Sequence, residues 1–335
     1  GEQGEPIALY AGFNEQDEAR FIVERAQSWI DDGNLRASIA ILYRSNAQSR
    51  VLEEALIRAD IPYRIYGGQR FYERLEIRNA LAYTRLLLNR SDDPAFERVI
   101  NTPSRGIGSK TIDNLRAIAR EHQVPMWQAI NISREEKLFP ARALTALAGF
   151  QSLIDELDSG TIDLPLEELV EHVIAQSGLV AFHRAEKGER GQARVENLEE
   201  LVSAAKSFVP EDEDLAPLQQ FLDKAALDAG DAQADAHEDS VQLMTLHSAK
   251  GLEFPLVFLA GMEENLFPHR MSLDEPGRLE EERRLAYVGI TRAMTQLVLT
   301  YAESRRLHGS ENYNTPSRFV REIPAQLMHE VRLNN

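Results

Sequence analysis

Apolar and polar residues at the start of the chain alternate between helical and strand-like spacing. Residues 14–31 carry apolar side chains three and four positions apart, which predicts a helix, and the pattern stops at Asp32-Gly33. Residues 39–43 form a short apolar run typical of a buried strand. A second helix is predicted over residues 48–59 and a second strand over residues 61–66. Roughly the first seventy residues therefore indicate an α/β fold.

The middle of the chain, roughly residues 70–235, has helical periodicity and few β-branched runs. Residues 210–216 and 230–239 combine acidic residues with proline or glycine and predict exposed loops. Helices are predicted over residues 75–88, 110–121, 141–157, 166–176 and 194–208.

The α/β pattern returns after residue 238. Strands are predicted over residues 241–247, 256–259 and 296–301, and a helix over residues 279–294. We therefore expect an α/β domain built from residues 1–68 and 237–335, interrupted by a mostly helical domain over residues 69–236. Several aromatic residues are expected in the cores, namely Tyr10, Phe13, Trp29, Phe221 and Phe258.

Composition narrows the class of protein. Cysteine is absent, which excludes disulfides and thiolate metal sites and suits the cytoplasm, and the eight histidines show no metal-ligand spacing, so no metal site is predicted. No apolar run approaches the roughly 20 residues that cross a bilayer. The chain begins without a basic and apolar leader, so we expect neither secretion nor membrane insertion.

The net charge of -17 argues against nucleic acid as a partner, but the charge is uneven. Residues 211–239 contain ten acids and a single lysine or arginine, Lys224. Residues 63–78 contain four arginines and four aromatic residues against two glutamates. Local patches, rather than net charge, must therefore identify the partner.

Two segments of the returning α/β region combine the residue types that bind phosphates and sugars. The first is TLHSAKGLEFP, residues 245–255, which follows a predicted buried strand, the place where α/β sheets hold ligands. The second is EEERRLAYVGITRA, residues 280–293. On the predicted helix, Arg284 and Arg292 lie about 80° apart, and Leu285, Val288 and Met294 can face the core.

Arginines on this helix could instead pair with nearby acids. Arg283 is expected to pair with Glu280–Glu282 one turn away. Arg292 has no acid three or four residues before it, so we expect its fork to be available for phosphate oxygens. Such an arginine can stabilise the charge of a transferring phosphoryl group.

These two segments resemble motifs V and VI of superfamily 1 helicases, in particular the UvrD-like group that includes PcrA and Rep. Two further segments, YRSNAQSR at residues 43–50 followed by YGG at 66–68, and TPSRGIG at residues 102–108, match the same group. The resemblance runs through nearly all 335 residues, and four ordered motifs at family spacing are very specific. It implies a RecA-like α/β domain, without its own P-loop, interrupted by the helical domain.

The resemblance also implies roles for single residues. Glu253 would hold the ribose of ATP, with Gly251 beside it, and Arg292 would reach the γ-phosphate as the catalytic arginine. The single strand would contact Arg44, Asn46, Thr245 and His247. A helix predicted to begin near Ser45 or Asn46 favours a phosphate there, although Asn46 could be a plain helix cap.

Other predicted DNA contacts lie outside these segments. Two glycines in Arg105-Gly106-Ile107-Gly108 let backbone amides approach a phosphate, and the family uses this element on duplex DNA. His308 stands where the family usually has an aromatic residue that stacks on a base, a contact of about 1–3 kcal/mol. His269 could approach DNA or lie in a surface loop.

The P-loop lysine and the Mg²⁺ carboxylates that position a triphosphate are not found in this sequence. The stretch Gly108-Ser109-Lys110-Thr111 lacks the P-loop spacing. We therefore expect a carboxy-terminal half of an ATP-dependent 3′ to 5′ helicase, which uses ATP with Mg²⁺ only when joined to the amino-terminal RecA-like half. Single-stranded DNA and its junctions with duplex would be the substrates, and excision-repair or mismatch-repair proteins possible partners.

Two other interpretations remain open at this point. The chain could be a binding module for duplex DNA, or for repair proteins that dock on its acidic loops. A helicase–nuclease subunit would need a carboxylate-rich nuclease domain, for which the sequence after residue 303 leaves no room.

Overall fold

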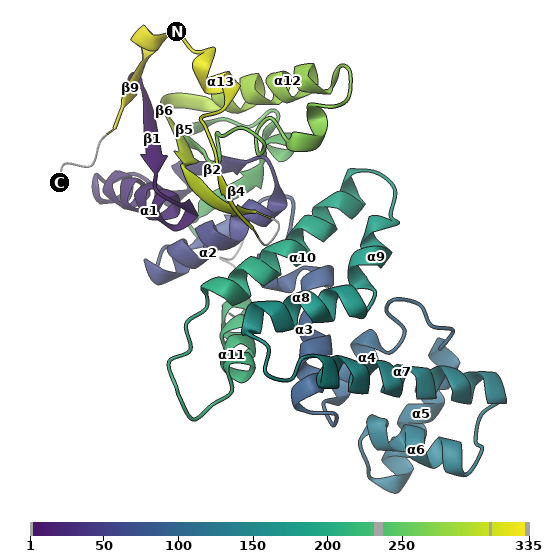
Figure 1. The fold of residues 1–335 in the computed structure, drawn as a ribbon. Coiled ribbons are helices and arrows are strands. Elements are labelled where there is room, and N and C mark those ends of the chain that lie inside the picture. The colour runs from purple at the N-terminus through teal and green to yellow at the C-terminus, as the bar shows by residue number, and fades with distance from the viewer. Residues whose placement is uncertain (1–2, 231–236, 308–309, 332–335) are drawn as a thin grey trace. The chain divides into compact units, whose positions relative to one another are not determined.

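The computed structural model describes residues 3–230, 237–307 and 310–331. The chain forms two compact units, one from residues 1–71 and 229–335 and the other from residues 72–228 (Figure 1). The second boundary falls inside a helix that ends at Gly230, whereas the sequence placed it after residue 236. The roles predicted for the two domains stay predictions.

The first unit is built on one sheet of seven parallel strands in the order β3-β4-β2-β5-β6-β1-β9. This confirms the predicted α/β fold class. The strands are β1 (Ile7–Gly12), β2 (Ile39–Tyr43), β3 (Tyr63–Ile65), β4 (Val241–Thr245), β5 (Phe254–Leu259), β6 (Ala293–Ala302) and β9 (Met328–Glu330).

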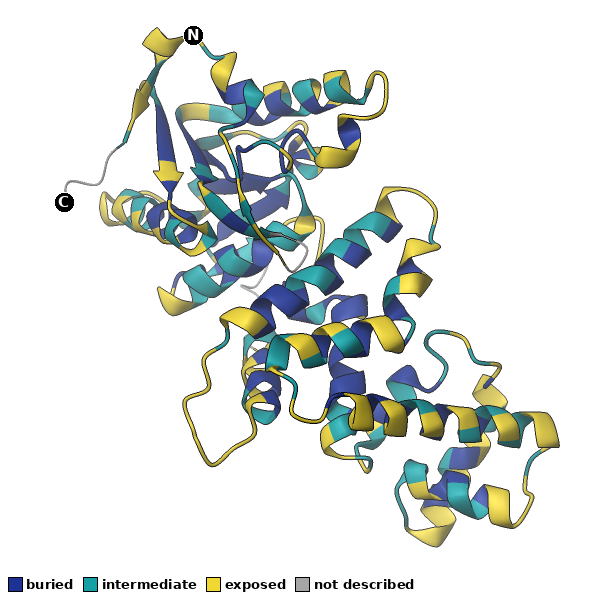
Figure 2. Cartoon of the chain, in the orientation of Figure 1, coloured by how far each residue is buried: buried dark blue, intermediate teal, exposed yellow. Residues whose placement is uncertain are grey.

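Helices cover both faces of this sheet. Ile39, Ile41 and Tyr43 of β2 pack in the same core as α1 (Glu15–Asp31) and α2 (Ser49–Arg58). The alternate residues Ala40 and Leu42 pack instead with α12 (Arg278–Ile290) and α13 (Arg318–Arg321). Because side chains alternate across a strand, a fully apolar strand such as β2 is one buried on both faces (Figure 2).

Short 3-10 helices connect several of these elements. They are η1 (Arg36–Ser38), η2 (Asn46–Gln48), η3 (Phe71–Glu73), η4 (Leu246–Ala249), η5 (Arg270–Ser272) and η6 (Ala325–Leu327). The predicted strand over residues 241–247 therefore ends at Thr245, where η4 begins.

A hairpin follows β6 and is anchored by a buried ionic cluster. Its strands are β7 (Ser304–Leu307) and β8 (Ser310–Tyr313). Arg305 on β7 donates to Glu263 at 2.9 Å and to Glu18 of α1, and all three side chains are buried. Glu18 also accepts from Thr300 of β6 at 2.9 Å, so the cluster ties the hairpin and α1 to the sheet.

The second unit consists of helices, as predicted for the middle of the chain. Helix α3 contacts α4, α7, α8 and α10 and forms the centre of this unit. The helices are α3 (Leu75–Leu88), α4 (Asp93–Val99), α5 (Ser109–His122), α6 (Met126–Glu135), α7 (Ala141–Gly160), α8 (Leu166–Gln176), α9 (Leu179–Arg184), α10 (Glu189–Ser207) and α11 (Pro217–Gly230).

Two expectations about single side chains need correction. Phe13 is 75% exposed rather than in the core, because it follows the last residue of β1, where the chain turns into the cap of α1. Met294 is 62% exposed and belongs to β6, because α12 ends at Ile290. Tyr10, Phe221 and Phe258 are buried as predicted, and Trp29 is partly buried against the sheet core.

The buried ionic cluster predicts a large loss of stability on truncation. We expect Arg305→Ala to lower the free energy of unfolding of the first unit by about 3–5 kcal/mol, since it leaves two buried carboxylates without their counter-charge. Urea unfolding followed by fluorescence measures this in a Trp127→Phe background, where Trp29 of the first unit is the remaining tryptophan.

Arg321→Ala is the matched control. Arg321 lies 3.8 Å from Glu264 and is exposed, so its removal should change the stability by no more than about 0.5 kcal/mol. Equal effects of the two substitutions would contradict the importance of the cluster.

Candidate DNA and nucleotide interfaces

The DNA-binding candidates of the first unit lie at one edge of its sheet. In a parallel sheet, all loops that follow strands lie at the carboxyl edge. Arg44 and Asn46 follow β2. Thr245 is the last residue of β4 and pairs in register with Tyr43 of β2, and His247 lies two residues further along the chain. The structure thus brings these four residues to neighbouring strand ends.

The loop after β2 is held by a capping box. Ser45 is the cap of η2, and the side chain of Gln48 accepts from the backbone N–H of Arg44 at 3.1 Å and of Ser45 at 2.9 Å. Ser45, rather than Asn46, therefore fills the cap position that the sequence left open between them. The backbone around Arg44 is fixed by this contact.

The Arg44 guanidinium is paired with Glu282 of α12. Its Nε lies 2.8 Å and 3.0 Å from the two carboxylate oxygens, and its Nη2 lies 2.7 Å from one of them. Glu282 also accepts from the backbone N–H of His269 at 3.0 Å, and its side chain is 4% exposed. Among the described residues, the Nη1 of Arg44 has no hydrogen-bond partner, so this edge of the fork is available to a further anion.

This pairing sets the protonation of Glu282. Burial alone raises its pKa, but the hydrogen bonds and charge of Arg44, together with the His269 N–H, lower it more, so the pKa lies below the ordinary 4.5. Glu282 is therefore ionised at neutral pH. This role of Glu282 could not be predicted, because Glu282 is one of three consecutive glutamates and no sequence pattern distinguishes it from the other two.

The segment after β4 crosses from one edge of the sheet to the other. Thr245 caps η4, and His247 is exposed beside it at the carboxyl edge. The chain then reaches Gly251, whose φ of +83° is a left-handed conformation that favours glycine, and exposed Glu253 directly before β5. Because β4 and β5 run in the same direction, Gly251 and Glu253 lie at the amino edge.

The nucleotide-binding candidates meet at this amino edge. Phe254, next to Glu253, donates its N–H to the carbonyl of Arg292 at 2.9 Å. The Arg292 guanidinium donates to the carbonyl of Leu252 at 2.9 Å and to that of Val288 at 3.0 Å. Its Nη2 also donates to the Thr291 hydroxyl at 3.2 Å. Within the described part of the chain no carboxylate pairs with Arg292, and its availability to phosphate oxygens stays a prediction.

The predicted helical relation of Arg284 and Arg292 is wrong. Helix α12 ends at Ile290, and Arg292 lies in the turn that leads into β6, so the 80° angle does not apply. The reason is strand pairing, since Ala293 already pairs with Phe254 of β5. Arg283 pairs with Glu280, as expected, and also with Glu322 at 3.0 Å.

In the second unit, the loop with Gly106 and Gly108 is supported by two polar side chains. Asn101 accepts from the N–H of Arg105 at 2.8 Å and of Ile107 at 3.2 Å. The Arg105 guanidinium donates to the Val99 carbonyl at 2.8 Å and is half-buried. Asn101 was not singled out from the sequence, since an isolated asparagine carries no pattern.

These contacts leave the two glycines exposed at the surface. Gly106 has a φ of +76°, and Gly108 is the cap of α5. The predicted contact of Arg105 with DNA stays a prediction. In the structure, its side chain stabilises the loop through the hydrogen bond to the Val99 carbonyl. His308 lies outside the described residues.

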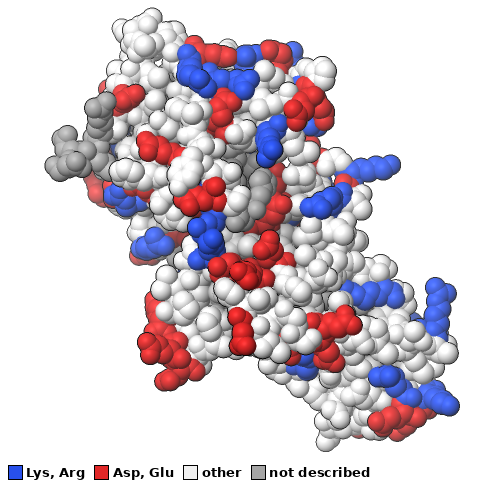
Figure 3. Space-filling view, in the orientation of Figure 1, with Lys and Arg blue, Asp and Glu red and all other residues white. Residues whose placement is uncertain are grey.

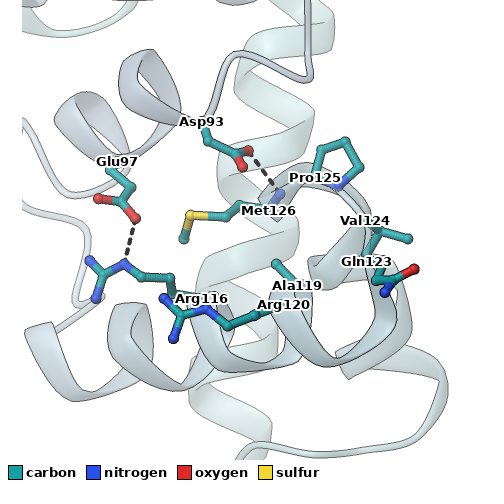
Figure 4. A pocket seen from close by; sticks show the side chains of 9 residues that line it. All are labelled: Asp93, Glu97, Arg116, Ala119, Arg120, Gln123, Val124, Pro125 and Met126. Carbon is teal, nitrogen blue, oxygen red and sulfur yellow. Dashed lines mark hydrogen bonds and ion pairs between the residues drawn. The ribbon is translucent and has the colours of Figure 1, made fainter.

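Charge and cavities add little to this assignment. Figure 3 shows acidic and basic side chains interspersed over the face that it draws. A pocket between α4, α5 and the start of α6 contains the ion pair of Glu97 and Arg116 at 2.7 Å (Figure 4). None of the residues with a predicted role lines it. In the described part of the chain, no helix is long and apolar enough to span a bilayer.

Comparison with known proteins identifies the family. Residues 1–304 match the UvrD-like helicase C-terminal domain, and the chain belongs to this family. It is 61% identical over 335 residues to DNA helicase II of Escherichia coli (strain K12), covering 99% of the chain and 46% of that protein. It is 42% identical over 337 residues to the ATP-dependent DNA helicase PcrA of Bacillus subtilis (strain 168), covering 98% and 45%. The chain thus spans about half the length of these relatives.

The lowered pKa of Glu282 predicts a pH-dependent effect of its substitution. We expect Glu282→Gln to lower the free energy of unfolding of the first unit by about 1.5–3 kcal/mol at neutral pH. A carboxyl with a depressed folded pKa stabilises above its unfolded pKa and loses this contribution as the pH falls through the folded value. The difference from wild type should therefore shrink below pH 4.5, the ordinary value.

Urea unfolding at a series of pH values, again in the Trp127→Phe background, measures this difference. Glu281→Gln, on the exposed side of the same helix, is the control and should show no such trend. A Glu282→Gln effect of constant size across the series would contradict an ionised, stabilising carboxylate.

Proposed function

We propose that this chain is one half of an ATP-dependent DNA motor that moves 3′ to 5′ along a single strand and separates the duplex ahead of it. Residues 1–68 and 237–335 would be the second RecA-like motor domain, and residues 69–236 the inserted domain that orients the duplex. The observation that carries the proposal is the placement of the two candidate groups at opposite edges of one sheet, joined by residues 245–253.

At the amino edge, the residues present fit a nucleotide. Glu253 offers an exposed carboxylate, which can accept hydrogen bonds from ribose hydroxyls. Arg292 offers a guanidinium that carbonyl oxygens orient and no described carboxylate neutralises, which suits a γ-phosphate. Mg²⁺ and the P-loop would come with the amino-terminal RecA-like domain, and ATP hydrolysis supplies the free energy for movement.

At the carboxyl edge, Arg44, Asn46, Thr245 and His247 would hold the single strand without reading its sequence. Charged and hydroxyl side chains at neighbouring strand ends suit contacts to phosphates and sugars. In the second unit, exposed Gly106 and Gly108 would let backbone N–H groups approach the duplex, and His308 would contribute a base contact. The motor would act in the cytoplasm with excision-repair or mismatch-repair proteins.

The chain alone should not hydrolyse ATP. Arg292 and Glu253 can complete a site but do not position a triphosphate by themselves. A steady-state assay of the purified chain should give turnover indistinguishable from buffer, with and without single-stranded DNA. Robust turnover that copurifies with the chain would contradict the division of the site between two halves.

A chimaera tests the proposed role directly. We expect DNA-stimulated ATPase activity when this chain replaces the matching half of E. coli DNA helicase II, whose 61% identity makes the replacement feasible. Arg292→Ala in the chimaera should lower the stimulated kcat by about 10³-fold or more, because it removes charge stabilisation from the transferring phosphoryl group.

Arg283→Ala is the control, since Arg283 pairs with Glu280 and Glu322 on the surface. It should retain the activity. Full activity of Arg292→Ala, together with DNA affinity that depends on Gly108, would favour instead a module that only binds duplex DNA.

A further inference from the structure

Helix α12 connects the two edges of the sheet. Its last residue, Ile290, is followed by Arg292 at the amino edge, whereas Glu282 in its second turn contacts Arg44 at the carboxyl edge. From Glu282 to Ile290 the helix advances about 12 Å at 1.5 Å per residue. One rigid element therefore carries contacts to both candidate ligand sites.

The helix is packed too tightly to slide independently of its neighbours. A Cβ at Gly289 would lie 2.6 Å from Leu246 of η4 and 2.9 Å from Leu259 of β5, so the helix approaches both elements closely. Leu246 belongs to the same segment as Thr245 and His247. A displacement of α12 must therefore displace η4 or open a void in the core.

The geometry of the contact between Glu282 and Arg44 allows it to transmit such a displacement. It is a side-on pairing through Nε and Nη2, it is nearly buried, and the His269 N–H fixes the second oxygen of the carboxylate. Two-point pairing of a planar guanidinium restricts its orientation as well as its position. The unpaired Nη1 edge of Arg44 is then directed by Glu282.

We propose that Glu282 is a positioning residue that couples the nucleotide site to the grip on single-stranded DNA. It sets the orientation of Arg44 toward a DNA phosphate, and a shift of Arg292 on nucleotide binding reaches Arg44 through α12. The inference rests on the proposed function and adds to it a specific route. Coupling of this kind is a free energy shared by both sites, so each ligand must change the affinity of the other by the same factor.

The test uses the chimaera with E. coli DNA helicase II and a fluorescein-labelled oligo(dT). The dissociation constant is measured with and without a nonhydrolysable ATP analogue, and the ratio of the two values reports coupling. We expect a ratio between about 5 and 150 in the wild type. In Glu282→Gln the ratio should approach one, and the effect of oligo(dT) on the affinity for the analogue should fall by the same factor.

Two further variants keep the test decisive. Glu281→Gln removes an exposed carboxylate from the neighbouring position and should retain the wild-type ratio. Arg44→Lys keeps the positive charge for a phosphate but loses the two-point pairing, so its ratio should also approach one. If the melting curve of Glu282→Gln shows that this variant does not fold, the result for Arg44→Lys alone decides the test.

The outcomes separate the two proposals. A wild-type ratio retained in Glu282→Gln or in Arg44→Lys overturns the coupling role, and so does tighter DNA binding by Glu282→Gln, which would mean that the carboxylate withholds Arg44 from DNA. A wild-type chimaera with DNA-stimulated ATPase activity but a ratio of one also overturns the coupling. A chimaera with neither property contradicts the proposed function itself.

Discussion

Parallel strand pairing is the constraint on which the arrangement of the first unit depends. When all seven strands run in one direction, every loop that follows a strand lies at one edge and every loop that precedes a strand lies at the other. A segment between two such strands must cross the sheet. Residues 245–253 make this crossing with a single turn of 3-10 helix, so one short segment presents Thr245 and His247 at one edge and Glu253 at the other.

Buried ion pairs hold the loops of the carboxyl edge in place. Arg305 with Glu18 and Glu263 anchors the hairpin after β6, and Arg44 with Glu282 anchors the loop after β2 to α12. Removing one partner of such a pair leaves a buried charge uncompensated, so the geometry is well defined even though the net gain in stability is modest. In this protein the two clusters fix the directions of loops that apolar packing alone would leave free.

Much of the fold could be predicted from the spacing of apolar residues. Helices α3 and α8 and strand β2 have the predicted limits, because the helical spacing of apolar residues and the unbroken apolar run of the strand each stop at a polar residue, namely Asn89, Ser177 and Arg44. The end of α12 could not be predicted, since helical periodicity continues through Met294 while pairing of Ala293 with β5 stops the helix. The spacing of apolar residues along α12 carries no information about pairing with a strand that is distant in the sequence.

The candidate sites were predictable only where motifs carry them. The resemblance supplied Arg44, Thr245, Glu253 and Arg292, but not the contacts that orient them. Glu282 lies 238 residues from Arg44, and no spacing rule connects positions so far apart. The direction of the Arg105 side chain could not be predicted for the same reason. Its guanidinium donates to the carbonyl of Ser177 at 3.3 Å, and Ser177 lies 72 residues away in the sequence.

The central claim is that opposite edges of this sheet serve different ligands. It is tested most directly by cross-linking, because the chain has no cysteine and accepts a single labelled one. Benzophenone would be attached to His247→Cys or to Glu253→Cys in the chimaera, with cysteines of the other half replaced. Our account predicts that single-stranded DNA cross-links from position 247 and not from position 253. Equal yields from both positions, or a preference for position 253, would contradict it.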